Sequence, residues 1–492
     1  MVPAFFAIER ARARRAAVFY GWWLGLVGNA VGFYWMIRLL ERFAGLSLPT
    51  SAALFLLVCG FQATRTALFG WALHAIRRNS NLPVAFVAPP LMVTLELCVP
   101  FIFQYYLAMA LARQPLLIQV ADLTGVMGVT ALLMLVNGAV YDVLTAPRRR
   151  VISAAVAASI LLATLGYGYL RIAQVGELRA AAPKLKVGIV QPNVVSFDER
   201  DGVFSVTDRR RLADLQARSA ELEAMGADLI LWPESSYPVW VSRRSSGDWP
   251  ETHPYHIGRG LSVPLVFDAL TYDPPKSAGQ PYNSALLLDR GSFAARYDKN
   301  NLMMFGEFIP GAETFPWLKR LTSNAGQYTA GREVVTLPFR DGGGREWRLG
   351  PMICLEDILP DFGRQLGQKH PHLLINLTND AWFGDTSEPW QHLALSVFRS
   401  VELRTDMVRA VNTGVSAYVD ATGRVYSESY VVDPTRDARG ADKMLAEVAL
   451  LEGGHTAYAS AGNSFSYACA ALTLYLWLIL PRVRRRRALI SA

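Results

Sequence analysis

An uncharged stretch of 22 residues, 16–37, is the feature that most constrains what this chain can fold into. An α-helix rises about 1.5 Å per residue and the hydrocarbon core of a bilayer is about 30 Å thick, so a stretch of this length can cross a membrane. Backbone polar groups in lipid must be satisfied within the chain, and we therefore expect a helix here. The stretch lacks the small-residue cleavage site of a signal peptide, which predicts a retained anchor.

Further apolar segments predict a multi-pass membrane protein. They cover roughly residues 51–76, 84–112, 123–141, 151–170 and 464–480. The composition agrees, because 52% of the 492 residues are hydrophobic and only 18% are charged, which is too apolar for an ordinary soluble enzyme. The sequence thus predicts six spans, five of them in an N-terminal bundle and one near the C-terminus.

A long polar section separates the two groups of spans and predicts separate domains. The expected parts are an N-terminal transmembrane bundle over residues 1–172, a polar domain over 184–455, a C-terminal transmembrane helix over 464–481 and a basic tail over 482–492.

Arginines predict the orientation, since short basic loops resist translocation. Only Arg38, Arg42 and Arg113 flank the spans on one side of a six-span arrangement. The other side carries Arg10, Arg12, Arg14, Arg15, Arg77, Arg78, Arg148, Arg149, Arg150, Arg482, Arg484, Arg485, Arg486 and Arg487. Both termini are therefore expected in the cytoplasm and the polar domain outside it, which in a bacterium means the periplasmic or outer face of the inner membrane. The net charge of +8 then reflects topology and anionic lipids, not nucleic acid.

Two charged residues fall inside the predicted spans. Arg65 and Glu96 lie at matching depth on the second and third of them. Charges in lipid are costly and are usually paired, so the sequence predicts an Arg65–Glu96 ion pair within the bundle. If the span boundaries are shifted by a few residues, Arg65 would instead extend to the membrane surface.

Short apolar runs predict strands in the polar domain, several of them buried on both faces. The runs are LKVGIVQPN, ADLILWPE, VPLVFDALTY, NSALLLD, WRLGPMIC and HLLINLTND. Residues 208–225 and 390–404 between them have helical spacing, and the glycines of DGGGRE indicate a hairpin connection. Strands that alternate with helices predict a layered α/β domain.

Three side chains suited to covalent chemistry stand at the ends of predicted strands. Glu234 follows LILWP, where partial desolvation would make it a general base, although a loop carboxylate in solvent also fits. Lys299 ends FAARYDK, and its ammonium could lower the pKa of a thiol and stabilise an oxyanion, unless it is an ordinary surface lysine. Cys354 ends WRLGPMIC and is the one cysteine outside the predicted spans. It is a candidate nucleophile, with a small buried hydrophobe as the alternative.

Together these segments resemble the nitrilase superfamily, in which a Glu-Lys-Cys triad occurs in this chain order on a four-layer αββα sandwich. The segments KNNLMMFGEFIP, INLTNDAWFGD and VRAVNTGVSAYVDATGRV, with spans on both sides of the domain, resemble the apolipoprotein N-acyltransferase family in particular. The resemblance implies a fold class of a multi-domain membrane protein, with a helical bundle beside an αββα domain. It also implies that Glu234 is the general base, Lys299 the stabiliser of oxyanion and thiolate, and Cys354 the nucleophile.

The resemblance adds supporting residues. Glu307 matches the second essential glutamate of the family, and Glu356 matches an acidic residue just after the nucleophile. Leu355 departs from the family, which usually has an aromatic residue there. Trp382 and Phe383 in NDAWFGD are candidate pocket or lipid-facing aromatics, with a place in the core as the alternative.

The reaction that the resemblance implies is acyl transfer from a lipid. A phospholipid, typically phosphatidylethanolamine, would acylate Cys354, and the N-terminal amine of a diacylated apolipoprotein, an S-diacylglyceryl cysteine, would take the chain in a ping-pong cycle. No cofactor is expected, and the seven histidines show no spacing typical of a metal site. A membrane-anchored nitrilase-type amidohydrolase, in which water attacks the thioester, and a non-catalytic scaffold are the alternatives.

Overall fold

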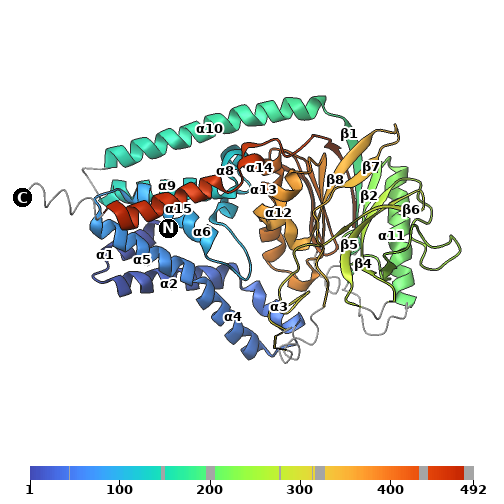
Figure 1. Ribbon diagram of the computed structural model, residues 1–492, viewed down its shortest axis with the longest axis horizontal. Coiled ribbons are helices and arrows are strands. Elements are labelled where there is room, and N and C mark those ends of the chain that lie inside the picture. The colour runs from blue at the N-terminus through green and yellow to red at the C-terminus, as the bar shows by residue number, and fades with distance from the viewer. Residues whose placement is uncertain are drawn as a thin grey trace, which may run out of the picture. The chain divides into compact units, whose positions relative to one another are not determined.

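The computed structural model describes residues 1–43, 45–145, 150–194, 206–275, 279–312, 314–315, 327–431 and 442–480. The chain forms two compact units, seen in Figure 1. The helical unit contains Met1–Ile37, Leu46–Ala173 and Ser460–Ala492, and the α/β unit contains Arg38–Gly45 and Gln174–Ala459. The basic tail predicted over residues 482–492 lies outside the described residues, as do Arg148 and Arg149.

The helical unit is built from apolar helices. They are α1 (Val2–Arg10), α2 (Arg14–Gly32), the start of α3 (Trp35–Phe43), α4 (Leu48–Gln62), α5 (Thr64–Asn79), α6 (Val84–Cys98), η1 (Leu107–Leu111), α7 (Pro115–Ile118), α8 (Ala121–Thr124), α9 (Val126–Thr145), most of α10 (Arg150–Ala181), the end of α14 (Ala457–Ala461), α15 (Ser464–Leu474) and the π-helical segment Tyr475–Ile479. Phe5, Leu73 and Met134 are among the residues that fill its core. Large apolar side chains such as Leu57 and Leu162 are instead more than half exposed, as expected for a surface that faces lipid.

By length and composition, three helical segments can cross a membrane. They are Leu48–Asn79, Val126–Thr145 and Arg150–Ala181, and the bent pair Arg14–Gly32 and Trp35–Glu41 would make a fourth. Shorter apolar helices cover Val84–Cys98, Pro115–Thr124 and Ser464–Ile479. The helices predicted over 51–76 and 151–170 are confirmed as the central parts of the first and third segments. The one predicted over 123–141 is confirmed from Val126 on, because α8 ends at Thr124 and α9 begins at Val126.

Two predicted spans are not continuous helices. The span over 84–112 is wrong beyond Cys98, because Val99 is extended and precedes Pro100, and a proline disfavours helical backbone in the residue before it. The span over 16–37 breaks after Gly32, where the two helices meet at 62°. The apolar length of each segment was read correctly, but its helix-stop signals were not.

The predicted ion pair inside the helical unit is confirmed. Arg65 Nη1 lies 3.9 Å from Glu96 Oε1, and each residue is only 3% exposed. Glu96 also accepts hydrogen bonds from the backbone N–H of Leu107 at 2.9 Å and from the hydroxyl of Thr130 at 2.8 Å. The guanidinium lies 3.4 Å from the centre of the Phe101 ring. The pair therefore connects α5 and α6 to the non-helical segment that follows Cys98.

The α/β unit contains two mixed β-sheets. The first has the order β13-β1-β2-β4-β5-β6, with β3 beside β4, and the second has the order β12-β11-β10-β9-β8-β7. The strands of the first are β1 (Lys184–Gln191), β2 (Leu229–Leu231), β3 (Val241–Ser242), β4 (Leu265–Tyr272), β5 (Tyr282–Asp289), β6 (Ser292–Asp298) and β13 (Asp442–Ala449). Those of the second are β7 (Leu337–Arg340), β8 (Glu346–Ile353), β9 (Leu373–Thr378), β10 (Met407–Val411), β11 (Gly414–Val419) and β12 (Val425–Val431).

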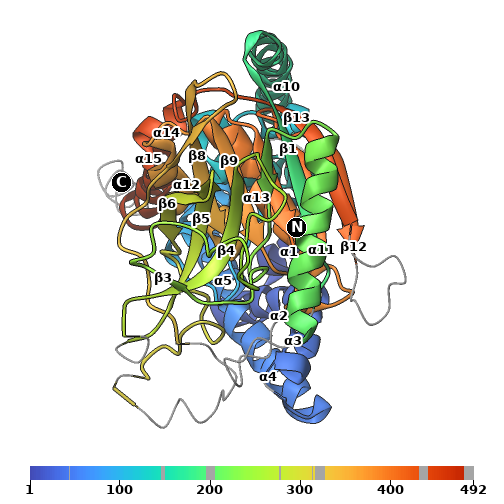
Figure 2. The same cartoon turned by 90° about the vertical axis from the view of Figure 1, so that its right-hand side faces the viewer.

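The two sheets face each other and carry helices on their outer faces, as Figures 1 and 2 show. The hydroxyl of Tyr418 in the second sheet donates to the carbonyl of Val187 in the first at 2.6 Å. Helix α11 (Val206–Ala224) covers the first sheet, while α12 (Pro360–Gly367) and α13 (Glu388–Leu403) cover the second. This is the four-layer αββα arrangement that the sequence resemblance implied.

Each predicted strand segment contains a strand, and both predicted helices are present as α11 and α13. The DGGGRE segment forms the predicted hairpin turn between β7 and β8, where the side chain of Asp341 accepts the N–H groups of Gly343 and Arg345, each at 2.9 Å.

Strand direction brings the candidate residues to one edge of the sandwich. Strand β2 runs parallel to β4, and β6 has the same direction because β5 lies antiparallel to both β4 and β6. Glu234 and Lys299 follow β2 and β6, so they lie at the same end of the first sheet. In the second sheet β8 and β9 are parallel, which places Cys354 and Asp380 together at one edge.

Candidate active site

Cys354 stands where β8 ends and the chain turns into η4 (Cys354–Ile358). Its φ of 51° is in the left-handed region, which costs roughly 1–2 kcal/mol for a residue with a Cβ and is typical of functional sites. The residue is 7% exposed. This is the strand-to-helix turn expected of a nucleophile.

Lys299 joins the two glutamates of the candidate site. Its Nζ lies 3.2 Å from Glu234 Oε1 and 2.8 Å from Glu307 Oε1. Asn283 donates to the same two oxygens at 2.9 and 3.2 Å, and the N–H of Met303 donates to Glu307 Oε2 at 2.8 Å. All three charged residues are buried. Glu234 is therefore not a loop carboxylate in solvent, and Lys299 is not an ordinary surface lysine.

Two carboxylates therefore share one buried ammonium. Burial raises the pKa of Glu234, Lys299 acts to lower it, and the charge of Glu307 raises it further. Burial alone would lower the pKa of Lys299, but Glu234 and Glu307 hold that pKa well above its usual range. The lysine thus remains an ammonium at neutral pH, and Glu234 is placed to take up a proton.

Burial and the charge of Glu234 raise the pKa of the Cys354 thiol well above its usual range. Lys299 acts in the opposite direction, as predicted from the sequence, but its effect is outweighed. The resting thiol is therefore protonated and needs a base before it can attack.

Glu356 is fully buried and receives four hydrogen bonds. Oε1 accepts from the Tyr297 hydroxyl at 2.7 Å and from the N–H groups of Asn300 and Asn301 at 2.8 and 3.0 Å, and Oε2 accepts from the N–H of Ile353 at 2.9 Å. Burial raises the pKa of Glu356 to about 7, against the lowering effect of these bonds. The side chain thus connects the loop after β6 to the nucleophile turn.

The two candidate pocket aromatics lie in η5 (Ala381–Phe383) and differ in exposure. Phe383 is 4% exposed and fits the core alternative, whereas Trp382 is half-buried. A role of either residue in binding substrate stays a prediction.

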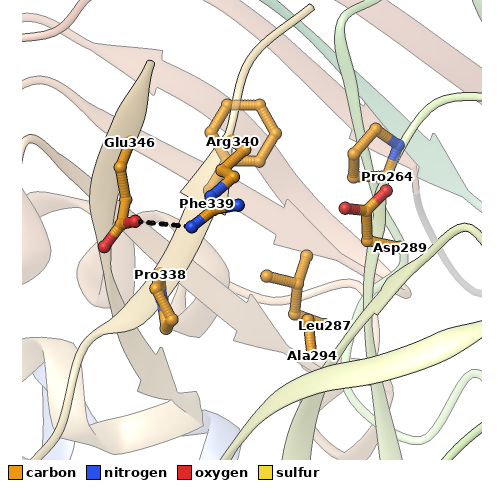
Figure 3. Close-up of a pocket in the computed structure, with 8 residues that line it drawn as sticks. All are labelled: Pro264, Leu287, Asp289, Ala294, Pro338, Phe339, Arg340 and Glu346. Carbon is orange, nitrogen blue, oxygen red and sulfur yellow. Dashed lines mark hydrogen bonds and ion pairs between the residues drawn. The ribbon is translucent and has the colours of Figure 1, made fainter. Parts of the chain in front are cut away.

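A cavity of about 320 Å³ lies elsewhere on the α/β unit. It is lined by Pro264, Leu287, Asp289, Ala294, Pro338, Phe339, Arg340 and Glu346, and Figure 3 shows the ion pair of the last two across β7 and β8. The four lining residues of the first sheet stand before β4, at the end of β5 and near the start of β6, which is the opposite end of that sheet from Lys299.

The sequence interpretation missed a second group of buried charges beside Cys354. Asp380, Glu388 and His392 offer atoms within 4.8 Å of one another, a spacing that could hold a metal ion. However, His392 Nδ1 and Nε2 each face a carboxylate, at 3.1 and 2.9 Å, and the second oxygen of Asp380 receives Arg409 at 3.1 Å. The group therefore has the contacts of an ion-pair network.

Asn283 was also missed as a site residue. It stands in the NSALLLD strand, while Asp380 and Arg409 stand in INLTND and VRAVN. The signals that could have identified these residues were thus polar side chains within apolar strand segments, which the sequence interpretation used only for the fold and the family resemblance.

Comparison with known proteins agrees with both units. Residues 1–139 match the family model of the apolipoprotein N-acyltransferase N-terminal domain, and residues 186–436 match that of carbon-nitrogen hydrolases. An apolipoprotein N-acyltransferase of Geobacter metallireducens is 29% identical over 95% of this chain and 88% of its own length. The one of Sinorhizobium medicae is 32% identical over 82% and 73%.

Among solved structures, a branch 10 member of the nitrilase superfamily from Saccharomyces cerevisiae aligns with a TM-score of 0.38 and 17% identity, over 54% of this chain and 90% of that chain. The assignment rests on the sequence matches instead, which cover both units and most of the relatives' length. This protein belongs to the apolipoprotein N-acyltransferase family.

Proposed function

We propose that this protein transfers an acyl chain from a membrane phospholipid, through a thioester on Cys354, to the N-terminal amine of an S-diacylglyceryl-cysteine apolipoprotein. Phosphatidylethanolamine is the donor we expect. The observation that carries the mechanism is the buried contact of Lys299 with both Glu234 and Glu307, in a site whose electrostatics reach the thiol of Cys354.

In the first half-reaction, Glu234 takes the thiol proton as Cys354 Sγ attacks the ester carbonyl of the donor. A C–S bond forms, and the Lys299 ammonium stabilises the charge that develops on the carbonyl oxygen. The C–O bond to the glycerol oxygen then breaks. That oxygen takes the proton from Glu234, so a lysophospholipid leaves and an acyl thioester remains.

In the second half-reaction, the neutral N-terminal amine of the lipoprotein attacks the thioester carbonyl. A C–N bond forms and Glu234 accepts a proton from the nitrogen. The C–S bond breaks, the leaving thiolate takes that proton, and the resting thiol returns. Because the two substrates use one site in turn, ping-pong kinetics follow.

The helical unit fits substrates that are both lipid-anchored. Its long apolar helices are suited to cross a membrane. From the distribution of arginines in the sequence we propose that the protein lies in a bacterial inner membrane and that residues 184–455 form an extracytoplasmic catalytic domain.

The test is intact mass of the purified protein after incubation with phosphatidylethanolamine, followed by a diacylglyceryl lipopeptide. We expect a fatty-acyl gain that the lipopeptide then removes and carries. Cys354→Ser is the control and should show no gain. Loss of the adduct to water with no lipopeptide product would instead support an amidohydrolase-type reaction. A gain retained in Cys354→Ala, in which neither a thioester nor an oxygen ester can form at this position, would refute the thioester.

A further inference from the structure

Four buried side chains behind the nucleophile form a closed ring of ion pairs. Asp357 lies between His392 and Arg409, with His392 Nε2 at 2.9 Å and a guanidinium N–H of Arg409 in direct contact. Asp380 lies between the same two cations, with His392 Nδ1 at 3.1 Å and Arg409 Nη2 at 3.1 Å. The four side chains are between 0 and 5% exposed. We refer to Asp357, His392, Asp380 and Arg409 as the charge ring.

The ring is electrically balanced by its own members. Burial and Arg409 act to lower the pKa of His392, but Asp357 and Asp380 raise it to about 10, so the imidazole is charged and donates from both nitrogens. Glu388 lies 3.8 Å from the same imidazole, and burial and Asp380 raise its pKa well above its usual range. With Glu388 neutral, two cations meet two carboxylates.

The charge ring contacts the nucleophile turn at two points. Asp357 belongs to η4, the turn that starts with Cys354. Asn376 makes the second contact, since its Nδ2 donates to the carbonyl of Cys354 at 3.2 Å while its Oδ1 accepts from Arg409 at 2.9 Å and from the Thr378 hydroxyl at 2.6 Å. Arg409 therefore reaches both ends of the turn, through one carboxylate and one amide.

The ring also contacts the turn that carries the half-buried Trp382. Asp380 is the residue directly before η5, and its carbonyl accepts the N–H of Phe383 at 3.1 Å. A Cβ at Gly414 would meet the Asp380 side chain at 2.9 Å, and the φ of Gly414 is +128°. The backbone of β11 thus approaches Asp380 at a position where only glycine fits without strain.

We propose that the charge ring is a positioning device for the acyl transfer: Arg409 and His392 hold Asp357 and Asn376 so that the turn at Cys354 keeps its left-handed backbone and aims Sγ at the acyl carbonyl. The ring residues are positioning residues and do not touch the substrate. This inference rests on the proposed role of Cys354. A backbone held in a strained conformation persists only where its surroundings determine it, and a small misplacement of the reacting atoms lowers the rate strongly.

The variants are chosen to weaken the ring by different routes. Asn376→Leu has a similar shape, leaves the ring charges in place and removes the donor to the Cys354 carbonyl. His392→Gln removes one of the two cations. Arg409→Lys keeps the charge but replaces the planar guanidinium with a point charge that has only three donors.

The matched control is Glu402→Gln. Glu402 lies on α13, as His392 does, and forms a buried ion pair with Arg399 at 2.8 Å, in which each side chain is 1% exposed. This variant disturbs a buried charge of the same helix whose ion-pair partner is not a ring member.

The first measurement is the rate of single-turnover acylation of Cys354 by phosphatidylethanolamine in the full-length protein, corrected for the folded fraction. The second is the rate of alkylation of Cys354 by iodoacetamide, with the modified residue located by peptide mapping. We expect Asn376→Leu and His392→Gln to lower the acylation rate roughly 10- to 100-fold with KM for the lipid within about twofold. Alkylation of Cys354 should slow as well. Glu402→Gln should keep the parent rates even if its thermal midpoint falls as far as those of Asn376→Leu and His392→Gln.

A double variant, His392→Gln with Arg409→Lys, tests whether the four residues act as one ring. The two cations share both carboxylates, so the double variant should lose little more activity than the worse single variant. If the losses of the two single variants multiply in the double variant, the four residues do not act as one ring. If Asn376→Leu is acylated and alkylated as fast as the parent protein, the positioning role is refuted. If the parent protein itself forms no adduct with any phospholipid, the proposed function fails first, and that result is distinguishable from both.

Discussion

Among the described residues, the buried Arg65 of the helical unit has one carboxylate partner, Glu96 at 3.9 Å. The buried Lys299 of the α/β unit has two, Glu234 at 3.2 Å and Glu307 at 2.8 Å. One cation with one anion leaves no excess charge. One cation with two anions leaves a negative charge inside the protein, which a proton can neutralise. The numbers of partners thus separate a contact that balances its own charge from one that can take up a proton.

The remaining partners of each carboxylate agree with this distinction. Glu96 accepts hydrogen bonds from the backbone N–H of Leu107 and the hydroxyl of Thr130, so its contacts connect segments of the chain. Glu234 accepts hydrogen bonds from the side chains of Asn283 and Lys299, and its charge raises the pKa of the Cys354 thiol. Its contacts therefore reach a reactive group.

The largest effect is expected where Glu234 and Glu307 lose the one cation that they share. Lys299→Met leaves Glu234 and Glu307 buried without an ammonium and removes the group that we propose to stabilise the oxyanion. Acylation of Cys354 by phospholipid, measured by intact mass over time, should fall by about 1,000-fold or more. Lys443→Met is the control, because Lys443 pairs with Glu221 at the surface. A Lys299→Met protein within tenfold of the parent rate would contradict the role assigned to this lysine.

The corresponding change in the helical unit should act on stability. Glu96→Gln leaves the guanidinium of Arg65 buried without a counter-charge, which should destabilise the protein by about 3 kcal/mol. Thermal unfolding in detergent measures this, while the acylation rate per folded molecule should stay near the parent value. If that rate collapsed at full stability, the pair would serve catalysis, and the distinction between the two units would be wrong.

Removal of the second carboxylate should change the pH dependence of acylation. The charge of Glu307 raises the pKa of Glu234, and the base must be ionised to take the thiol proton. In the parent, the rate is therefore lost as pH falls through a pKa above the ordinary value of about 4.3. In Glu307→Gln this acidic limb should move to lower pH, with a rate roughly 10- to 100-fold lower because Lys299 is held less firmly. Rate–pH profiles of both proteins test this shift. If the acidic limb does not move, the charge of Glu307 does not affect the pKa of Glu234.

The smallest effect is expected at Thr130. Thr130→Val keeps the shape of the side chain but removes the hydroxyl that donates to Glu96 at 2.8 Å. Loss of this hydrogen bond, together with the longer one that the same hydroxyl accepts from the N–H of Ala108 at 3.3 Å, should lower stability by about 1–2 kcal/mol. The effect should shrink in the Glu96→Gln background, where the acceptor is already changed. If Thr130→Val destabilised the Glu96→Gln protein as much as the parent, Thr130 would stabilise the protein through a contact other than the one with Glu96.

The sequence by itself determined the two-part organisation and most elements of this protein. Apolar length predicted the long helices of the helical unit, and short apolar runs predicted strands such as β8 and β9, because both signals depend on local composition and periodicity. Strand ends also indicated where Glu234, Lys299 and Cys354 stand. Arg65 and Glu96 were paired correctly, since two charges at one depth in lipid have few other solutions.

Only the tertiary structure decided which polar groups act together. Arg409 meets Asp357 across 52 residues of sequence and Asn376 across 33, and no local pattern carries such a contact. The breaks after Gly32 and Cys98 depended on backbone signals that the apolar length of a segment does not carry. The sequence indicated that Lys299 could lower the pKa of a thiol, but the pKa of the Cys354 thiol is raised because burial outweighs the lysine. Desolvation depends on everything that surrounds a group, and only the folded chain determines that.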